Sequence, residues 1–183
     1  MRLFIAIDLP APVRAALAEV QARLRRHDLA VRWAAIEGMH LTLQFLGETE
    51  AQLLPDLRAA LARIPPPSFT LRLSGLGTFP NPTRPRVLWV GLGNDLAPLD
   101  ELQQAVLDAT RPLGFAPEAR AFSPHLTLGR TRQEASSAQI QAIASAVHNT
   151  APPVATIWLA DQARLFQSTS TPNGMVYTIL GPS

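Results

Sequence analysis

The apolar residues of this chain follow two periods in turn, one typical of strands and the other typical of helices. Residues 2–8 form a short apolar run that ends at Asp8, and this run predicts a buried strand. Pro10 and Pro12 then open a segment whose apolar residues recur at helical spacing, so an amphipathic helix is expected to follow. The apolar face of that helix consists of Val13, Leu17, Val20 and Leu24.

The same succession of elements returns in the second half of the chain. Residues 86–92 predict another buried strand, and Pro98 precedes another amphipathic helix. After each helix comes a strand that reads His-Leu-Thr-Leu, at residues 40–43 and 125–128. The spacing between the first strand and this motif is almost the same in both halves, which indicates an internal repeat.

The repeat continues beyond the two motifs. Thr49 with Gln52, and Ser136 with Gln139, are typical of capping boxes at the start of a helix. Strand-like segments then close the halves, at Phe69–Leu73 in the first and at Val154–Leu159 and Met175–Leu180 in the second. We therefore predict a single α+β domain with two β-α-β-α-β halves, about residues 1–83 and 84–183, related by a pseudo-twofold axis. Antiparallel sheets would surround a central cleft, with the helices outside.

The composition excludes several classes of chemistry. The chain has no cysteine, so thiol nucleophiles, disulfides and thiolate metal sites are ruled out. It also has no lysine, which excludes Schiff bases and the adenylyl-lysine of ATP-dependent ligases. The net charge is only +2, so it permits a phosphate-bearing ligand without requiring one. The apolar runs are too short to span a membrane, and we expect a cytoplasmic protein without an obligate protein partner.

Alternation along a strand decides which side chains of the two motifs share a face. His40 and Thr42 are expected on one face, opposite the leucines between and after them, and His125 with Thr127 repeats this arrangement. By the same parity Phe45 is expected to point into the core. A pseudo-twofold axis would bring the two His-Thr pairs together across the cleft.

Two imidazoles and two hydroxyls around one point suit the hydrolysis of a phosphodiester. One neutral imidazole takes a proton from water while the other, as imidazolium, gives a proton to the departing oxygen. Thr42 and Thr127 can donate hydrogen bonds to the phosphate oxygens, and Arg130 can add a forked contact. No metal ion, cofactor or covalent nucleophile is required, and the symmetry of the repeat leaves open which histidine is the acid.

Four segments of the chain resemble the bacterial 2′-5′ RNA ligase family, now understood as RNA 2′,3′-cyclic phosphodiesterases within the two-histidine phosphoesterase superfamily. These segments are residues 2–10, 40–47, 86–91 and 122–130. The resemblance implies an RNA substrate that ends in a 2′,3′-cyclic phosphate and a product with a 2′-phosphomonoester. It also implies that His40 is the proton donor to the leaving oxygen and that His125 is the base that activates water.

Two other functions remain open on the sequence. The reverse type of reaction at the same site, from a cyclic phosphate and a 5′-hydroxyl, would be ATP-independent 2′-5′ RNA ligation. A non-catalytic module that only binds RNA ends is the alternative of a different class, although the histidine in both motifs argues against it, since binding alone could use Arg or Ser. Replacing either histidine by alanine distinguishes the enzyme, which would lose turnover, from the module, which would only bind more weakly.

Overall fold

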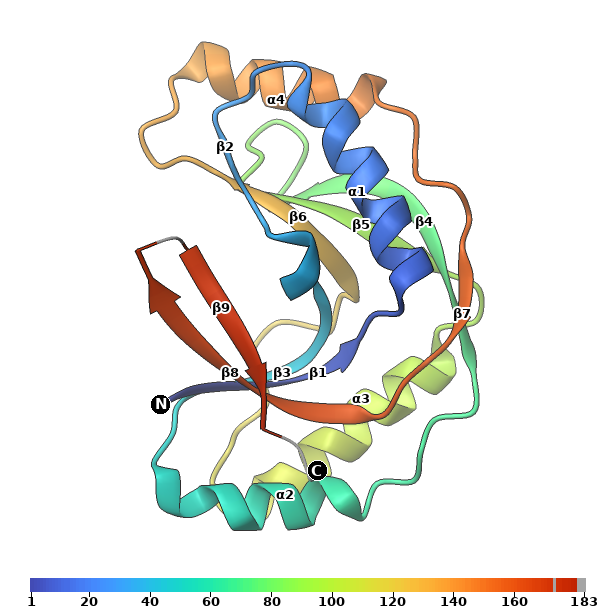
Figure 1. Cartoon of the computed structure of the whole chain (residues 1–183), viewed down its shortest axis with the longest axis vertical. Coiled ribbons are helices and arrows are strands. Elements are labelled where there is room, and N and C mark those ends of the chain that lie inside the picture. The colour runs from blue at the N-terminus through green and yellow to red at the C-terminus, as the bar shows by residue number, and fades with distance from the viewer. Residues whose placement is uncertain (173, 181–183) are drawn as a thin grey trace.

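Two antiparallel sheets form the centre of the computed structural model, which describes residues 1–172 and 174–180 (Figure 1). The four-stranded sheet has the order β3-β1-β8-β9, and the five-stranded sheet has the order β2-β6-β5-β4-β7. The strands are β1 (Arg2–Asp8), β2 (Val31–Trp33), β3 (His40–Glu48), β4 (Thr70–Phe79), β5 (Val87–Gly93), β6 (His125–Thr131), β7 (Ile157–Leu159), β8 (Ala163–Thr171) and β9 (Gly174–Ile179).

The helices begin where the sequence places prolines or a cap. A proline occupies the first turn of three of the four α-helices, where its missing N–H costs no hydrogen bond. The predicted capping box of the fourth helix is confirmed: the Gln139 N–H donates to Ser136 Oγ (3.3 Å), and the Ser136 N–H donates to Gln139 Oε1 (2.9 Å). The helices are α1 (Ala11–Arg25), α2 (Leu54–Ala62), α3 (Ala97–Thr110) and α4 (Ser137–Asn149), with 3₁₀ turns η1 (Ile36–Gly38), η2 (Ala51–Leu53) and η3 (Arg111–Leu113).

The capping box predicted at Thr49 is wrong. Thr49 is buried; its N–H donates to the Met1 carbonyl (2.8 Å) and its hydroxyl to the Gly47 carbonyl (3.3 Å). These bonds hold Thr49 at the end of β3 beside the N-terminus, so its side chain is not free to cap a helix. The chain passes through η2 before α2 begins, and α2 has no side-chain cap.

The helices cover the outer faces of the sheets in two pairs. α1 and α4 lie along the five-stranded sheet, and α2 and α3 lie along the four-stranded sheet (Figure 1). The Gln21 side chain of α1 donates to the Leu128 carbonyl of β6 (3.0 Å), and the Thr110 hydroxyl of α3 donates to Gln44 Oε1 of β3 (2.8 Å). Each sheet therefore buries one face against helices. No helix in the described residues is both long and apolar enough to cross a membrane.

The α+β class, the antiparallel sheets and the outer helices are confirmed, but each sheet combines strands from both halves of the chain. β1 and β3 pair directly, as do their second-half counterparts β5 and β6. Strands from each half then cross to the other sheet: β4 of the first half pairs with β5, and β8 of the second half pairs with β1 and carries β9 with it. The boundary near residue 83 thus marks the sequence repeat rather than the membership of the sheets.

Candidate active site

The two motif histidines lie at the starts of equivalent strands. His40 is the first residue of β3 and His125 is the first residue of β6. These strands belong to different sheets but contact each other. The two rings are also close enough for the charge of His125 to affect the pKa of His40. The structure therefore brings together the pair that the repeat predicted.

A backbone carbonyl two residues upstream holds each histidine ring. Nδ1 of His40 lies 2.7 Å from the Gly38 carbonyl oxygen, and Nδ1 of His125 lies 2.7 Å from the Ser123 carbonyl oxygen. A carbonyl can only accept a hydrogen bond, so Nδ1 carries a proton and donates it in both rings. The other nitrogen, Nε2, is thereby left to accept a proton when the ring is neutral and to donate one when the ring is charged.

Aromatic rings surround the two histidines unequally. The His40 ring packs on Phe4, Tyr177 and Phe166, with centroid distances of 4.5, 4.9 and 5.7 Å. The His125 ring contacts Phe79 edge-on, with a centroid distance of 4.8 Å. Phe4, Phe166 and Tyr177 come from β1, β8 and β9, so the outer hairpin of the four-stranded sheet helps to enclose His40.

Burial is the main influence on both imidazoles, and it lowers the pKa of each below the ordinary histidine value. The bond from each ring to its backbone carbonyl opposes this and raises the pKa. The nearby side-chain charges differ between the two rings. The Asp8 carboxylate raises the pKa of His40 while Arg14 lowers it, and the Arg130 guanidinium lowers the pKa of His125.

Asp8 and Arg14 are neighbours of the site that sequence reasoning did not identify. Asp8 is the last residue of β1 and pairs directly with His40 across the sheet. Its Oδ1 accepts hydrogen bonds from the Leu9 N–H (2.9 Å) and from Arg14 Nη2 (2.6 Å), so the carboxylate is held in place. The signal in the sequence was the polar end of an otherwise buried strand, which also fits an ordinary strand terminus.

The motif threonines are half-buried and lie beside the histidines. Thr42 pairs with Ala6 of β1, one step along the face that begins with the pair Asp8 and His40. Thr127 pairs with Trp89 of β5 on the corresponding face of the other sheet. Their positions are those expected from alternation, while their contact with substrate remains a prediction.

Phe45 lies on the same face as His40, so the expectation that it points into the core is wrong. The pairing of β1 with β3 shifts register between Ile5 and Ala6: Ala6 faces Thr42, but Phe4 faces Phe45. This bulge adds one residue to β3, and the extra residue reverses the alternation beyond it. Phe45 is accordingly 55% exposed, and its ring lies beside Phe4 at a centroid distance of 6.2 Å.

An equivalent bulge in β6 returns Arg130 to the face of His125. The register shifts between Leu88 and Trp89, so Thr127 faces Trp89 and Arg130 faces Val87. Arg130 is exposed, and its charge acts on His125. Arg130 and Phe45 thus occupy corresponding positions in the two motif strands, one carrying a guanidinium and the other an aromatic ring.

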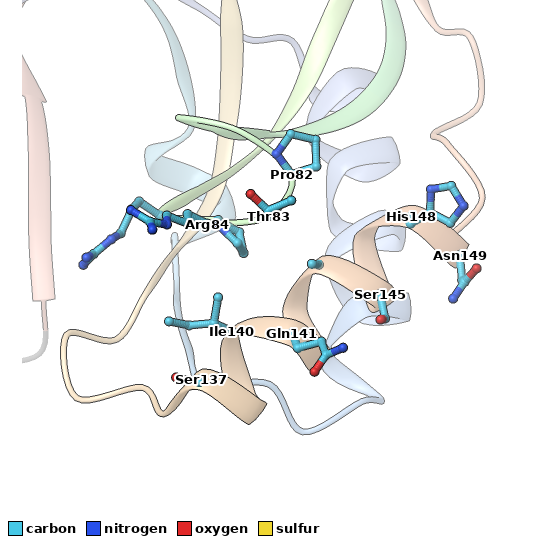
Figure 2. Close-up of a pocket in the computed structure, with 12 residues that line it drawn as sticks. Pro82, Thr83, Arg84, Ser137, Ile140, Gln141, Ser145, His148 and Asn149 are labelled. Carbon is cyan, nitrogen blue, oxygen red and sulfur yellow. The ribbon is translucent and has the colours of Figure 1, made fainter.

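A cavity of about 790 Å³ lies elsewhere, between the loop at residues 82–86 and helix α4 (Figure 2). Thr83 and Arg84 line one side of it, and Gln141 and His148 of α4 line the other. None of the residues predicted for the site lines this cavity. The described part of the chain also contains no group of three or more His, Asp or Glu side chains placed to bind a metal ion.

The fold and the paired histidines define a phosphoesterase of the two-histidine class. The chain belongs to the LigT-like phosphoesterase family, whose model matches residues 7–89 and 92–177. It is 32% identical to an RNA 2′,3′-cyclic phosphodiesterase of Thermotoga maritima, over 98% of this chain and 93% of that protein. A Thermus thermophilus protein of the same name is 36% identical, over 98% of this chain and 88% of the relative.

Solved structures of the family have the same fold. The crystal structure of Escherichia coli LigT complexed with 3′-AMP superposes with a TM-score of 0.77 at 31% identity. The match covers 98% of this chain and 94% of the other. The similarity therefore extends over both sheets and both motif strands.

Proposed function

We propose that this protein hydrolyses the 2′,3′-cyclic phosphodiester at the end of an RNA to a 2′-phosphomonoester, without a metal ion. The observation that carries the proposal is the matched geometry of His40 and His125, each of which donates from Nδ1 to a carbonyl and leaves Nε2 for the reaction. The name that curated relatives share, RNA 2′,3′-cyclic phosphodiesterase, supports the same substrate.

The reaction needs one proton acceptor and one proton donor on opposite sides of phosphorus. Nε2 of His125 takes a proton from water as the water oxygen forms a bond to phosphorus. The bond from phosphorus to O3′ breaks, and Nε2 of protonated His40 gives its proton to that oxygen. The products are a 3′-hydroxyl and a 2′-phosphomonoester. His40 is then neutral and His125 charged, and exchange of protons with water restores both for the next turnover.

The charges beside the rings favour this assignment of roles. Burial disfavours the charged form of both rings. Among the nearby side-chain charges, the Asp8 carboxylate favours a proton on His40 more than Arg14 disfavours it, while the Arg130 guanidinium disfavours a proton on His125. Of the two singly protonated forms of the pair, these side-chain charges therefore favour the one with the proton on His40. That form has its acid at the leaving oxygen and its base at the water.

The other site residues hold the phosphate and the terminal nucleoside. Thr42, Thr127 and Arg130 share the faces of the histidines and can donate hydrogen bonds to the non-bridging oxygens, where negative charge accumulates in the transition state. Phe45 offers an exposed ring on the same face as His40. A nucleobase can stack on such a ring whatever its identity.

The regiochemistry of the product tests the proposal. A short RNA that ends in a 2′,3′-cyclic phosphate is incubated with the protein, and the product is compared with 2′-phosphate and 3′-phosphate standards by chromatography and mass. We expect conversion to the 2′-phosphate alone, because the proposed mechanism makes O3′, and not O2′, the leaving oxygen that His40 protonates. A 3′-phosphate would reverse the placement of the substrate, and an RNA that is bound but not converted would identify the site as a binding module.

A further inference from the structure

Two arginines lie directly opposite each other at the edge of the five-stranded sheet. Arg32 of β2 pairs in register with Arg130 of β6. Directly opposed residues share a face of the sheet, so Arg32 lies on the face that carries Thr127 and His125. Both arginines are exposed. Nothing in the sequence distinguishes Arg32 from the other arginines, because β2 has only three residues and is too short to be predicted from its pattern.

Within the described residues, no ion pair neutralises these two arginines. Like charges placed directly opposite each other destabilise a sheet. None of the four ion pairs found among the described residues includes Arg32 or Arg130. On its other side Arg130 faces Val87, which carries no charge. Two uncompensated guanidiniums on the site face are suited to bind an anion that the substrate brings.

The two arginines differ in their relation to the reacting group. Arg130 lies on the same strand and face as His125, and its charge lowers the pKa of that ring, so its guanidinium suits the reacting phosphate. Arg32 lies on β2, at the edge of the sheet and one strand beyond the strand that carries His125. Arg32 therefore suits a second phosphate, one beyond the phosphate that is hydrolysed.

We propose that Arg32 binds the phosphodiester on the 5′ side of the terminal nucleotide, while Arg130 binds the cyclic phosphate. This proposal rests on the proposed function and names the substrate class more closely. A nucleoside 2′,3′-cyclic phosphate has no second phosphate, whereas every RNA chain has one. Arg32 is thus the residue that makes the site prefer RNA ends to cyclic mononucleotides.

The test compares two substrates that differ only by this phosphate. The kcat/KM values for the dinucleotide ApA with a 2′,3′-cyclic end and for adenosine 2′,3′-cyclic phosphate are measured with the wild type and with Arg32→Ala. We expect Arg32→Ala to lower the dinucleotide value about 10-fold, the effect of one lost charge-assisted hydrogen bond, and to change the mononucleotide value less than about twofold. The salt dependence for the dinucleotide should weaken, because one phosphate contact is lost.

Arg63→Ala is the matched control. Arg63 is an exposed arginine at the end of α2, so its loss removes the same charge from a distant surface. We expect no change with either substrate. An equal loss on both substrates with Arg32→Ala would place Arg32 at the reacting phosphate, and no loss on either would show that it binds none; both results overturn the proposal. A wild type that converts neither substrate would contradict the proposed function, and the role of Arg32 with it.

Discussion

Each catalytic candidate depends on one backbone carbonyl. The carbonyls of Gly38 and Ser123 accept hydrogen bonds from Nδ1 of His40 and His125, which fixes the tautomer and leaves Nε2 as the nitrogen for proton transfer. The sequence predicted the histidines and the threonines beside them, because a repeated four-residue motif carries both. It could not predict the neighbours of His40, since Asp8, Phe166 and Tyr177 reach it only through strand pairing.

The leaving group tests the two roles at the residue scale. A nucleoside 2′,3′-cyclic phosphate with sulfur in place of O3′ has a leaving group that departs without a proton, because thiols are far more acidic than alcohols. On the oxygen substrate we expect His40→Ala and His125→Ala each to lose at least about 100-fold in kcat/KM. On the sulfur substrate, measured by release of thiol, His40→Ala should recover most of its activity and His125→Ala should not. Recovery of His125→Ala instead would reverse the assignment.

The pH dependence follows from the burial of the two rings. Burial lowers the pKa of both His40 and His125, and the proposed mechanism needs one ring charged and the other neutral. We expect a bell-shaped profile of kcat/KM with its maximum below about pH 6.5, the ordinary histidine value. Above that pH the fraction of protein with a charged ring, and kcat/KM with it, falls about tenfold per pH unit. A rate that keeps rising to pH 8 would contradict this account.

At the scale of the elements, one extra residue in each motif strand decides what reaches the site. Alternation predicts Thr42 and Thr127 correctly, because they precede the bulges. Beyond the bulges alternation fails, which explains why Phe45 was expected in the core. A bulge depends on how two strands pair, and this pairing cannot be predicted from the apolar pattern of a single strand.

Gly38, the last residue of the 3₁₀ turn before β3, lies against Tyr177 of the β8–β9 hairpin. A Cβ atom added at Gly38 would lie 2.8 Å from Cδ2 of Tyr177, which itself packs on His40. We expect Gly38→Ala to displace Tyr177 and the His40 ring, and to lower kcat by about 100-fold, the usual scale for a misplaced catalytic group. Gly75→Ala in β4 is the control, since its Cβ meets no atom within 4 Å. Equal activity of the two variants would show that Tyr177 does not hold His40.

At the scale of the whole molecule, the two halves of the sequence share both sheets. The internal repeat predicted the α+β class and the outer helices, because these follow from the order and periodicity of the elements. It did not predict that β4 and β8 cross to the opposite sheet, since either pairing buries the same apolar face. β8 itself was missed because residues 167–171 read Gln-Ser-Thr-Ser-Thr, a run more typical of a loop.

The shared sheets imply that neither half folds alone. A fragment of residues 1–83 keeps β1 and β3 but loses β8, and it keeps β4 but loses β5. We expect this fragment to show no cooperative thermal transition by circular dichroism, whereas the full chain unfolds in a single step. Cooperative unfolding of the fragment would show that the halves are independent units.

The central claim is that His40 and His125 hydrolyse a cyclic phosphodiester without a metal ion. It is tested most directly by giving an RNA with a 2′,3′-cyclic phosphate end to the wild type, His40→Ala, His125→Ala and the double variant, all in excess EDTA. We predict that EDTA leaves the wild-type rate unchanged and that each single variant loses at least about 100-fold. The double variant should be little slower than either single one, because the two residues act as a unit. Loss of wild-type activity in EDTA, or a fast variant, would contradict the claim.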